Sequence, residues 1–213
     1  MKKAMLTVSI AVCFMVAFSF PSYGSIMYAD HITNISRGTV SGNLVDYYGG
    51  SFPGSYPISL TPAQAAAAVL GAPDSNFLSL PGGVANTTPA YVEVGFATNF
   101  LADHLYITEL GANQESALIF VWFANGGNVQ PSVTRNGTDT LDIDLSPYAA
   151  LMNANGGSFS KVGIMGKDQL GASWGFDLDA IGVTAAAVPE PTTMLLLGFG
   201  LIGLAGARRR MSK

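Results

Sequence analysis

The middle of the chain alternates between apolar and polar residues, which is the pattern of β-strands with one buried face. Over residues 90–97 the even positions are Ala, Val, Val and Phe, and the odd positions are Tyr, Glu, Gly and Ala. Over residues 140–145 the odd positions are Leu, Ile and Leu, and the even positions are Thr, Asp and Asp. Residues 117–123 are apolar throughout, which predicts a central strand covered on both faces.

Breaks rich in glycine and asparagine separate these runs. Residues 125–127 and 155–157 both read Asn-Gly-Gly, and residues 136–137 read Asn-Gly. Glycine and asparagine tolerate the positive φ angles that tight turns between strands require. We therefore expect turns at these three places.

One helix stands out against the strand pattern. Thr61 is placed to cap it, Pro62 lies in its first turn, and an alanine-rich run continues to Leu70 before Gly71 ends it. A further helical turn is expected after Pro147. Many short strands and little helix predict an all-β fold, an antiparallel β-sandwich of the jelly-roll type with one short helix.

The N-terminal residues have the three parts of a secretory signal peptide. Lys2 and Lys3 form a basic stretch, residues 4–18 are apolar, and small residues lead to Gly24. We expect signal peptidase to cut between Gly24 and Ser25. A permanent N-terminal anchor is the weaker alternative, because the apolar run is short and a cleavage site follows it.

The C-terminal residues combine a proline-rich motif, a short apolar run and a basic cluster. The apolar run, residues 192–207, spans about 24 Å as a helix, whereas a bilayer core is about 30 Å thick. Such a helix inserts when the bilayer thins locally or when flanking side chains snorkel. Arg208, Arg209 and Arg210 follow it and fix that end in the cytoplasm.

The motif before the apolar run is Pro189-Glu190-Pro191. The two prolines keep the backbone around Glu190 extended and outside the helix, in a form that a protease on the outer side can reach. The alternative is an ordinary single-pass tail in which proline only marks the start of the helix.

These three parts, in this order and spacing, resemble the PEP-CTERM sorting signal of Gram-negative bacteria. In that family an exosortase, a membrane-embedded enzyme similar to cysteine transpeptidases, recognises the tail and processes it near the motif. The resemblance covers about the last 25 residues. It implies a substrate of sorting that is exported through the inner membrane, anchored there transiently and then passed to the cell surface or extracellular matrix.

The resulting layout has five parts. We expect a signal peptide (1–24), an exported β-sandwich (25–184), a linker with the motif (185–191), a transmembrane helix (192–207) and a basic cytoplasmic tail (208–213). Part of the middle region also resembles galactose-binding-like or discoidin-like jelly rolls that accompany this tail. The resemblance is carried by four segments: 70–74, 103–109, Glu115 and 176–181.

Removal of both ends makes the exported part strongly acidic. The chain has ten Lys and Arg and fourteen Asp and Glu. Six of the ten basic residues lie in the terminal segments, which leaves four and a net charge near −10 with Glu190 included. Nucleic acid is therefore not an expected partner, because phosphate binding needs clustered cations. The only cysteine, Cys13, lies in the signal peptide, so no disulfide is expected in the exported part.

The carboxylates are the one chemical feature that is open to a functional interpretation. Calcium takes six to eight oxygen ligands, often from carboxylates in loops. Asp103, Glu109, Glu115 and Asp179 are the candidate calcium ligands. The alternative, which we favour, is a solvated acidic face or buried carboxylates bonded to neighbouring backbone amides.

No set of residues predicts catalysis. Residues 171–175 read Gly-Ala-Ser-Trp-Gly, which matches the nucleophile-elbow pattern. That elbow needs a helix after the serine and a histidine downstream, whereas His31 and His104 both precede Ser173. We expect Ser173 to be a turn residue, His104 to be a surface or partly packed imidazole, and the protein not to be an enzyme.

Three functions remain open. The first is a noncatalytic envelope or extracellular-matrix protein, structural or associated with exopolysaccharide and biofilm. The second is a carbohydrate-binding or adhesive module, and the third and least favoured is a secreted hydrolase with paired carboxylates. The aromatic residues that could stack on sugars are Tyr47, Tyr48, Tyr56, Trp122 and Trp174. Trp122 is expected to be buried, because aromatic residues in strands usually belong to the core.

Overall fold

The computed structural model describes residues 25–40, 43–44, 46–54, 56, 58–82, 88–101, 103–110, 115–131, 140–167 and 175–184. All of these except Ser25 belong to one compact unit, Ile26–Ala185. The predicted signal peptide, sorting motif, membrane helix and arginine cluster lie outside the described residues, as do the Asn-Gly turn at 136–137 and Ser173. No helix in the described ranges is both long enough and apolar enough to cross a membrane.

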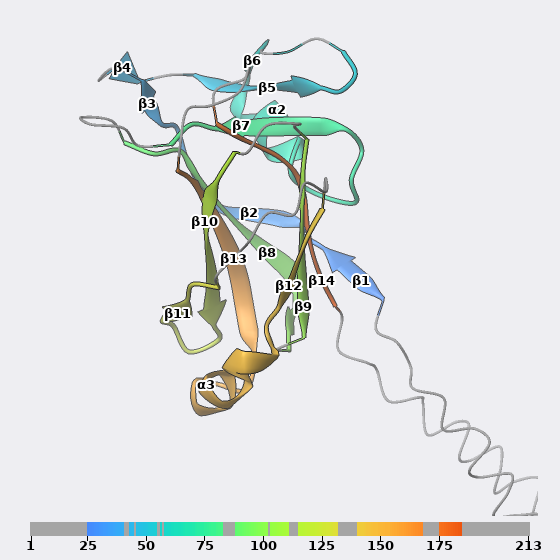
Figure 1. Ribbon diagram of the computed structural model, residues 1–213, viewed down its shortest axis with the longest axis vertical. Coiled ribbons are helices and arrows are strands. Elements are labelled where there is room, and N and C mark those ends of the chain that lie inside the picture. The colour runs from blue at the N-terminus through green and yellow to red at the C-terminus, as the bar shows by residue number, and fades with distance from the viewer. Residues whose placement is uncertain are drawn as a thin grey trace, which may run out of the picture. The chain divides into compact units, whose positions relative to one another are not determined.

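Two antiparallel sheets make up the unit (Figure 1). The seven-stranded sheet has the order β12-β9-β14-β7-β5-β6, and β1 also pairs with β14. Its strands are β1 (Ile26–Tyr28), β5 (Tyr47–Ser51), β6 (Ile58–Leu60), β7 (Asn76–Leu80), β9 (His104–Glu109), β12 (Thr140–Asp144) and β14 (Phe176–Thr184). β14 is buried along almost its whole length, and β9, β7 and β1 all pair with it.

The five-stranded sheet has the order β11-β10-β13-β8-β2. Its strands are β2 (His31–Ser36), β8 (Tyr91–Phe100), β10 (Ala117–Phe123), β11 (Asn128–Val129) and β13 (Phe159–Gly166). A small separate hairpin joins β3 (Thr39–Val40) to β4 (Asn43–Leu44). The all-β antiparallel sandwich is thus confirmed, and its arrangement is compatible with a jelly roll.

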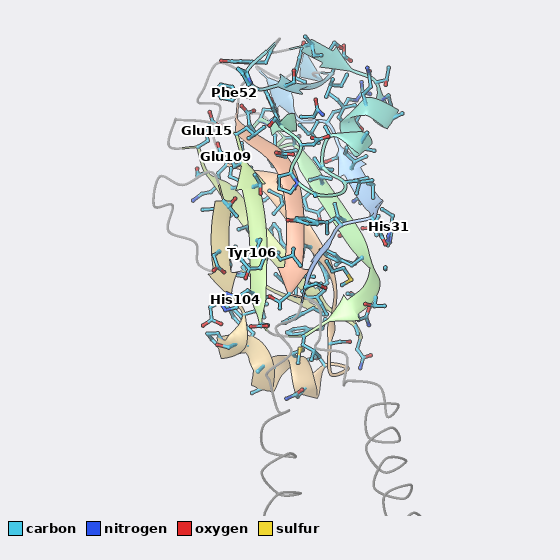
Figure 2. The ribbon with its side chains drawn as sticks, turned by 90° about the vertical axis from the view of Figure 1, so that its right-hand side faces the viewer. His31, Phe52, His104, Tyr106, Glu109 and Glu115 are labelled. Atoms are coloured by element: carbon cyan, nitrogen blue, oxygen red, sulfur yellow. The ribbon has the colours of Figure 1, made fainter. Side chains whose placement is uncertain are left out.

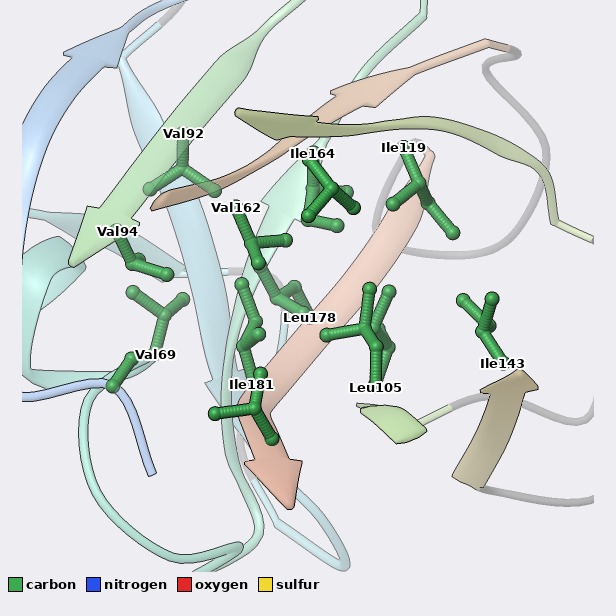
Figure 3. Close-up of a cluster of buried hydrophobic side chains, with 14 of the residues drawn as sticks. Val69, Val92, Val94, Leu105, Ile119, Ile143, Val162, Ile164, Leu178 and Ile181 are labelled. Carbon is green, nitrogen blue, oxygen red and sulfur yellow. The ribbon is translucent and has the colours of Figure 1, made fainter. Parts of the chain in front are cut away.

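The core lies between the two sheets (Figure 3). Val92 and Val94 of β8 and Ile164 of β13 extend from the five-stranded sheet, and Leu105 of β9 and Ile181 of β14 from the other. Each such side chain, when fully buried, stabilises the fold by roughly 1.5–3 kcal/mol. The predicted alternation over 140–145 is confirmed, because the apolar positions of β12 are the buried ones. Over 90–97 the apolar residues Val92, Val94 and Phe96 are buried as predicted, but Glu93 and Gly95 between them are buried as well.

The prediction for residues 117–123 was wrong in one respect. Ile119, Val121 and Phe123 enter the core, but Phe120 and Trp122 lie half-buried on the outer face of β10. No second layer of the described chain covers that face. The residues are apolar throughout because the outer face carries its own aromatic cluster, described below.

The predicted helix forms but is shorter than expected. α2 covers Pro62–Ala67, with Thr61 as N-cap and Gln64 completing a capping box. The helix ends before Leu70 because the chain leaves the helical path after its C-cap, Ala68. The Gly71 N–H then donates to the Ala29 carbonyl (2.9 Å) and does not continue the helix. Gly71 has a φ of +90°.

A second short helix follows Pro147, as the sequence predicted. A 3-10 turn, η1 (Ser146–Tyr148), leads into α3 (Ala149–Ala154). The Asn-Gly-Gly segments at 125–127 and 155–157 both make turns in which the two glycines have positive φ angles. α3 lies at the opposite end of the sandwich from α2 and the β5–β6 hairpin (Figure 1).

Candidate functional site

The structure does not bring all four predicted calcium ligands together. Asp103 lies in the bend before β9, whereas Glu109 is the last residue of that strand. They share strand parity but are separated by roughly 20 Å at about 3.3 Å per residue. The Asp103 side chain is 54% exposed and Glu109 is 1% exposed. Asp103 therefore cannot share an ion with Glu109.

The other three carboxylates lie toward one end of the sandwich. Asp179 lies at a register shift in β14. Leu178 before it pairs with Glu109, and Ala180 after it pairs with Thr108. Glu109 and Glu115 lie at the same end of the molecule, opposite His104 (Figure 2). All three carboxylates are buried. Within the described ranges, no group of three or more acidic, His or Cys side chains is arranged to hold a metal ion.

Asp179 holds a loop in place. Its carboxylate accepts hydrogen bonds from the backbone N–H groups of Asp74 and Ser75, both at 3.2 Å. Burial raises the pKa of Asp179, although these two backbone hydrogen bonds act in the opposite direction. Ser75 has a φ of 70°, which is uncommon for a residue other than glycine. Asp179 thus fits the alternative given above, a buried carboxylate bonded to backbone amides.

His104 lies on the outer face of β9, as the sequence predicted. Its Nδ1 lies 2.6 Å from an oxygen of Asp142 on the neighbouring strand β12, and its ring stacks with Tyr106. The hydrogen bond with Asp142 raises the pKa of His104 above its ordinary value, and burial opposes this change only in part. Asp103 lies 3.7 Å from the other ring nitrogen. The histidine is a partly exposed member of an ion pair between strands.

A charged network occupies the outer face of the five-stranded sheet. Glu93 of β8 accepts hydrogen bonds from Thr33 (2.6 Å), Tyr91 (2.8 Å) and Lys161 (2.7 Å). Burial works to raise the pKa of Glu93, but the hydrogen bonds from Lys161, Thr33 and Tyr91 together lower it below its ordinary value. Glu93 is thereby held as a carboxylate next to Lys161.

Aromatic rings surround this network. Trp122 lies 5.7 Å from Phe120 and 6.4 Å from Tyr91, and the Lys161 ammonium lies 5.2 Å from the Trp122 ring centre. The end of the indole crosses Gly163, where an added Cβ would lie 2.7 Å from two ring carbons. We call Tyr91, Glu93, Phe120, Trp122 and Lys161 the outer cluster. The expectation that Trp122 is buried in the core was therefore wrong.

Exposed apolar side chains gather on a different part of the molecule, the β5–β6 hairpin. Phe52, Tyr56 and Ile58 are 53%, 42% and 43% exposed. We call these three residues the hairpin patch. They are half of the six large apolar side chains that are exposed in the described part of the chain. Phe52 lies at the end of the molecule opposite His104 (Figure 2).

A shallow depression of about 310 Å³ adjoins the hairpin patch. Ile58 and Phe77 line it, and the ring of Phe77 lies 6.0 Å from that of Tyr56, which in turn lies 6.3 Å from Phe52. Its polar lining includes Ser51, Gln64, Asp74 and Asn76. The lining of the depression thus combines apolar side chains with hydrogen-bonding groups, and Phe77 connects it to the rings of Tyr56 and Phe52, which lie outside the lining itself.

Of the aromatic residues named from the sequence, Tyr56 alone belongs to the hairpin patch. Tyr47 and Tyr48 are half-buried, and Trp174 lies outside the described residues. Phe52 was missed, although it lies in a stretch rich in Gly, Ser and Pro between 49 and 57. Aromatic residues in such a stretch tend to be exposed, because turns lie on the surface.

Comparison with known families concerns the C-terminal segment of the chain. Residues 187–210 match the family model of the PEP-CTERM protein-sorting motif. A comparison with curated proteins gave no match. The motif marks the chain as an exported protein that is targeted to an exosortase and processed while anchored at the membrane. The predicted resemblance of the tail is confirmed.

Proposed function

We propose that the exported β-sandwich is a noncatalytic component of the envelope or extracellular matrix of a Gram-negative bacterium, associated with exopolysaccharide. The observation that carries the proposal is the PEP-CTERM motif at residues 187–210. Signal peptidase removes residues 1–24, the apolar run 192–207 holds the chain in the membrane, and exosortase then separates the sandwich from that anchor.

A noncatalytic role is supported by how the polar side chains are used. Asp179 and Glu93 bind groups of their own fold, and His104 pairs with Asp142 on the surface. A secreted hydrolase of the paired-carboxylate type would instead need two carboxylates that face an open cleft. The carboxylates that share an end of the sandwich, Glu109, Glu115 and Asp179, are buried.

Mass spectrometry of the C-terminus tests the sorting step. In cells with the exosortase, we expect the mature chain to lack residues 211–213, and in cells without it we expect them to be retained in the membrane fraction. A wild-type chain that still ends at Lys213 contradicts the proposal.

Because Asp103 is remote from Glu109, three of the four calcium candidates remain, Glu109, Glu115 and Asp179, although no group of three such side chains in the described ranges is arranged to hold an ion. If these three bind calcium, its addition to metal-stripped protein raises the melting temperature and releases or absorbs heat in calorimetry. An unchanged melting temperature and no heat would leave the three carboxylates with a structural role alone.

A carbohydrate-binding surface module is the second candidate function. The observation that favours it is the hairpin patch beside a depression with polar lining. This second function is compatible with the first, because a matrix protein can be retained by binding the polymer around it.

A further inference from the structure

We propose that the depression beside the β5–β6 hairpin binds a segment of an uncharged polysaccharide. Phe52 and Tyr56 would stack on the apolar faces of sugar rings, and Gln64, Asp74 and Asn76 would bond to their hydroxyl groups. The inference rests on the proposed function, in which the sandwich is placed among extracellular polymers, and it names the site that would hold one.

The apolar half of the site consists of rings that are exposed in spite of their size. Phe52 and Tyr56 lie 6.3 Å apart at an angle of 45°, and the buried Phe77 supports Tyr56 from below at 6.0 Å in an edge-on contact. Exposed aromatic rings cost free energy in water, so a contiguous pair held by a buried third ring indicates a binding surface. Sugar rings offer flat faces of C–H groups that match such rings.

The polar half of the site still has hydrogen-bonding capacity. Gln64 uses its side-chain carbonyl in the capping box with Thr61, which leaves the amide NH₂ as a donor. Asp74 accepts two hydrogen bonds from Asn76, each at 2.9 Å, and a carboxylate has about four acceptor positions. Asn76 keeps its carbonyl oxygen as an acceptor. Such a set of donors and acceptors suits vicinal hydroxyl groups.

Charge favours a neutral polymer over an acidic one. Asp74 is the only charged residue among the described residues that line the depression. The exported part as a whole has four basic residues against fourteen acidic ones when Glu190 is counted. An anionic polysaccharide would therefore be repelled, whereas a neutral one would not.

The outer cluster is a weaker site for stacking. The Lys161 ammonium lies over the Trp122 ring, and the Glu93 carboxylate already binds Thr33, Tyr91 and Lys161. A sugar there would have to displace contacts within the fold. The hairpin patch requires no such displacement.

The test measures binding of the full chain in detergent micelles to dextran, hydroxyethylcellulose and galactomannan, with alginate as the anionic probe, by microscale thermophoresis. We expect binding to at least one neutral polymer and little to alginate. Tyr56→Ala and Phe52→Ala should each weaken binding about three- to tenfold, the size of one aromatic contact. Asp74→Asn should also weaken binding, although Phe52 and Tyr56 are unchanged in that variant.

Leu151→Ala is the matched control, because Leu151 is an exposed apolar residue of α3 at the far end of the sandwich. It should leave the dissociation constant unchanged, and melting curves of all variants check that each one is folded. No binding to any neutral polymer, equal binding by Tyr56→Ala and wild type, or stronger binding to alginate would overturn the inference. Those results would leave the sorting proposal untouched, because C-terminal mass spectrometry tests that separately.

Discussion

At the scale of single residues, the fate of each carboxylate depends on the donors that tertiary structure brings to it. Glu93 and Asp179 are both buried acids on strands. Glu93 meets Lys161 and two hydroxyl groups, and its pKa falls. Asp179 instead meets two backbone N–H groups, and burial raises its pKa.

Lys161→Met tests the outer cluster. The substitution removes the cation beside Glu93 and leaves a largely buried carboxylate with only hydroxyl donors. We expect the free energy of unfolding to fall by roughly 1–2 kcal/mol. This is less than the 3–5 kcal/mol expected for a fully buried pair, because Lys161 is partly exposed. Urea unfolding measures it. Glu93→Gln in the same chain should recover part of the loss, and failure to do so would contradict the pairing.

The pH dependence of the same site has a defined sign. Because the pKa of Glu93 is lower in the folded state than its ordinary 4.5, its ionised form stabilises the fold above that pH, and this contribution is lost as pH falls through the folded-state pKa. Urea unfolding of wild type and Glu93→Gln between pH 7 and the acid range measures this effect. The free energy of unfolding should fall less toward acid pH in the variant than in wild type.

Asp179→Ala should detach the loop that follows α2. The N–H groups of Asp74 and Ser75 would lose their acceptor, and one such loss costs about 1–3 kcal/mol. Asp179→Asn should cost less, because its carbonyl oxygen still accepts one of the two bonds and no buried charge remains. Denaturant unfolding compares the two variants. Equal losses in the free energy of unfolding would contradict the role of Asp179 in holding this loop.

At the scale of elements, the edge strand β12 is held by alternating apolar side chains and by one ion pair with β9. Leu141 and Ile143 enter the core, while Asp142 on the outer face meets His104. This pairing connects β12, the strand that precedes η1 and α3, to β9, the strand that ends at Glu109.

His104→Gln should remove a small, pH-dependent contribution to stability. The raised pKa of His104 means that the contribution is full below the ordinary value of 6.5 and is lost as pH rises through the folded-state pKa. Since the His104 and Asp142 side chains are 41% and 55% exposed, we expect about 0.2–1 kcal/mol. Melting temperatures at pH 5.5 and 8.5 should differ between wild type and variant mainly at the lower pH.

At the scale of the whole molecule, the sandwich and the tail perform separate tasks. The tail directs export and processing through its PEP-CTERM motif, and the sandwich presents the surface that meets the environment. A fluorescent fusion that ends at Ala187 should therefore lose anchored processing and differ in final location from the full chain, as cell fractionation would show. The same location for both would contradict the role of the tail.

The sequence by itself determined the features that depend on local order. Strand alternation, the Asn-Gly-Gly turns and the Thr61 cap follow from neighbours along the chain, and the tail is recognised from one short segment. Tertiary structure decided which faces are covered and which polar groups meet. Trp122 lies outside the core because Gly163 and Lys161 on the adjacent strand accommodate it. Glu93 with Lys161 and Asp179 with Ser75 meet only after distant segments pair, and periodicity contains no information about such pairing.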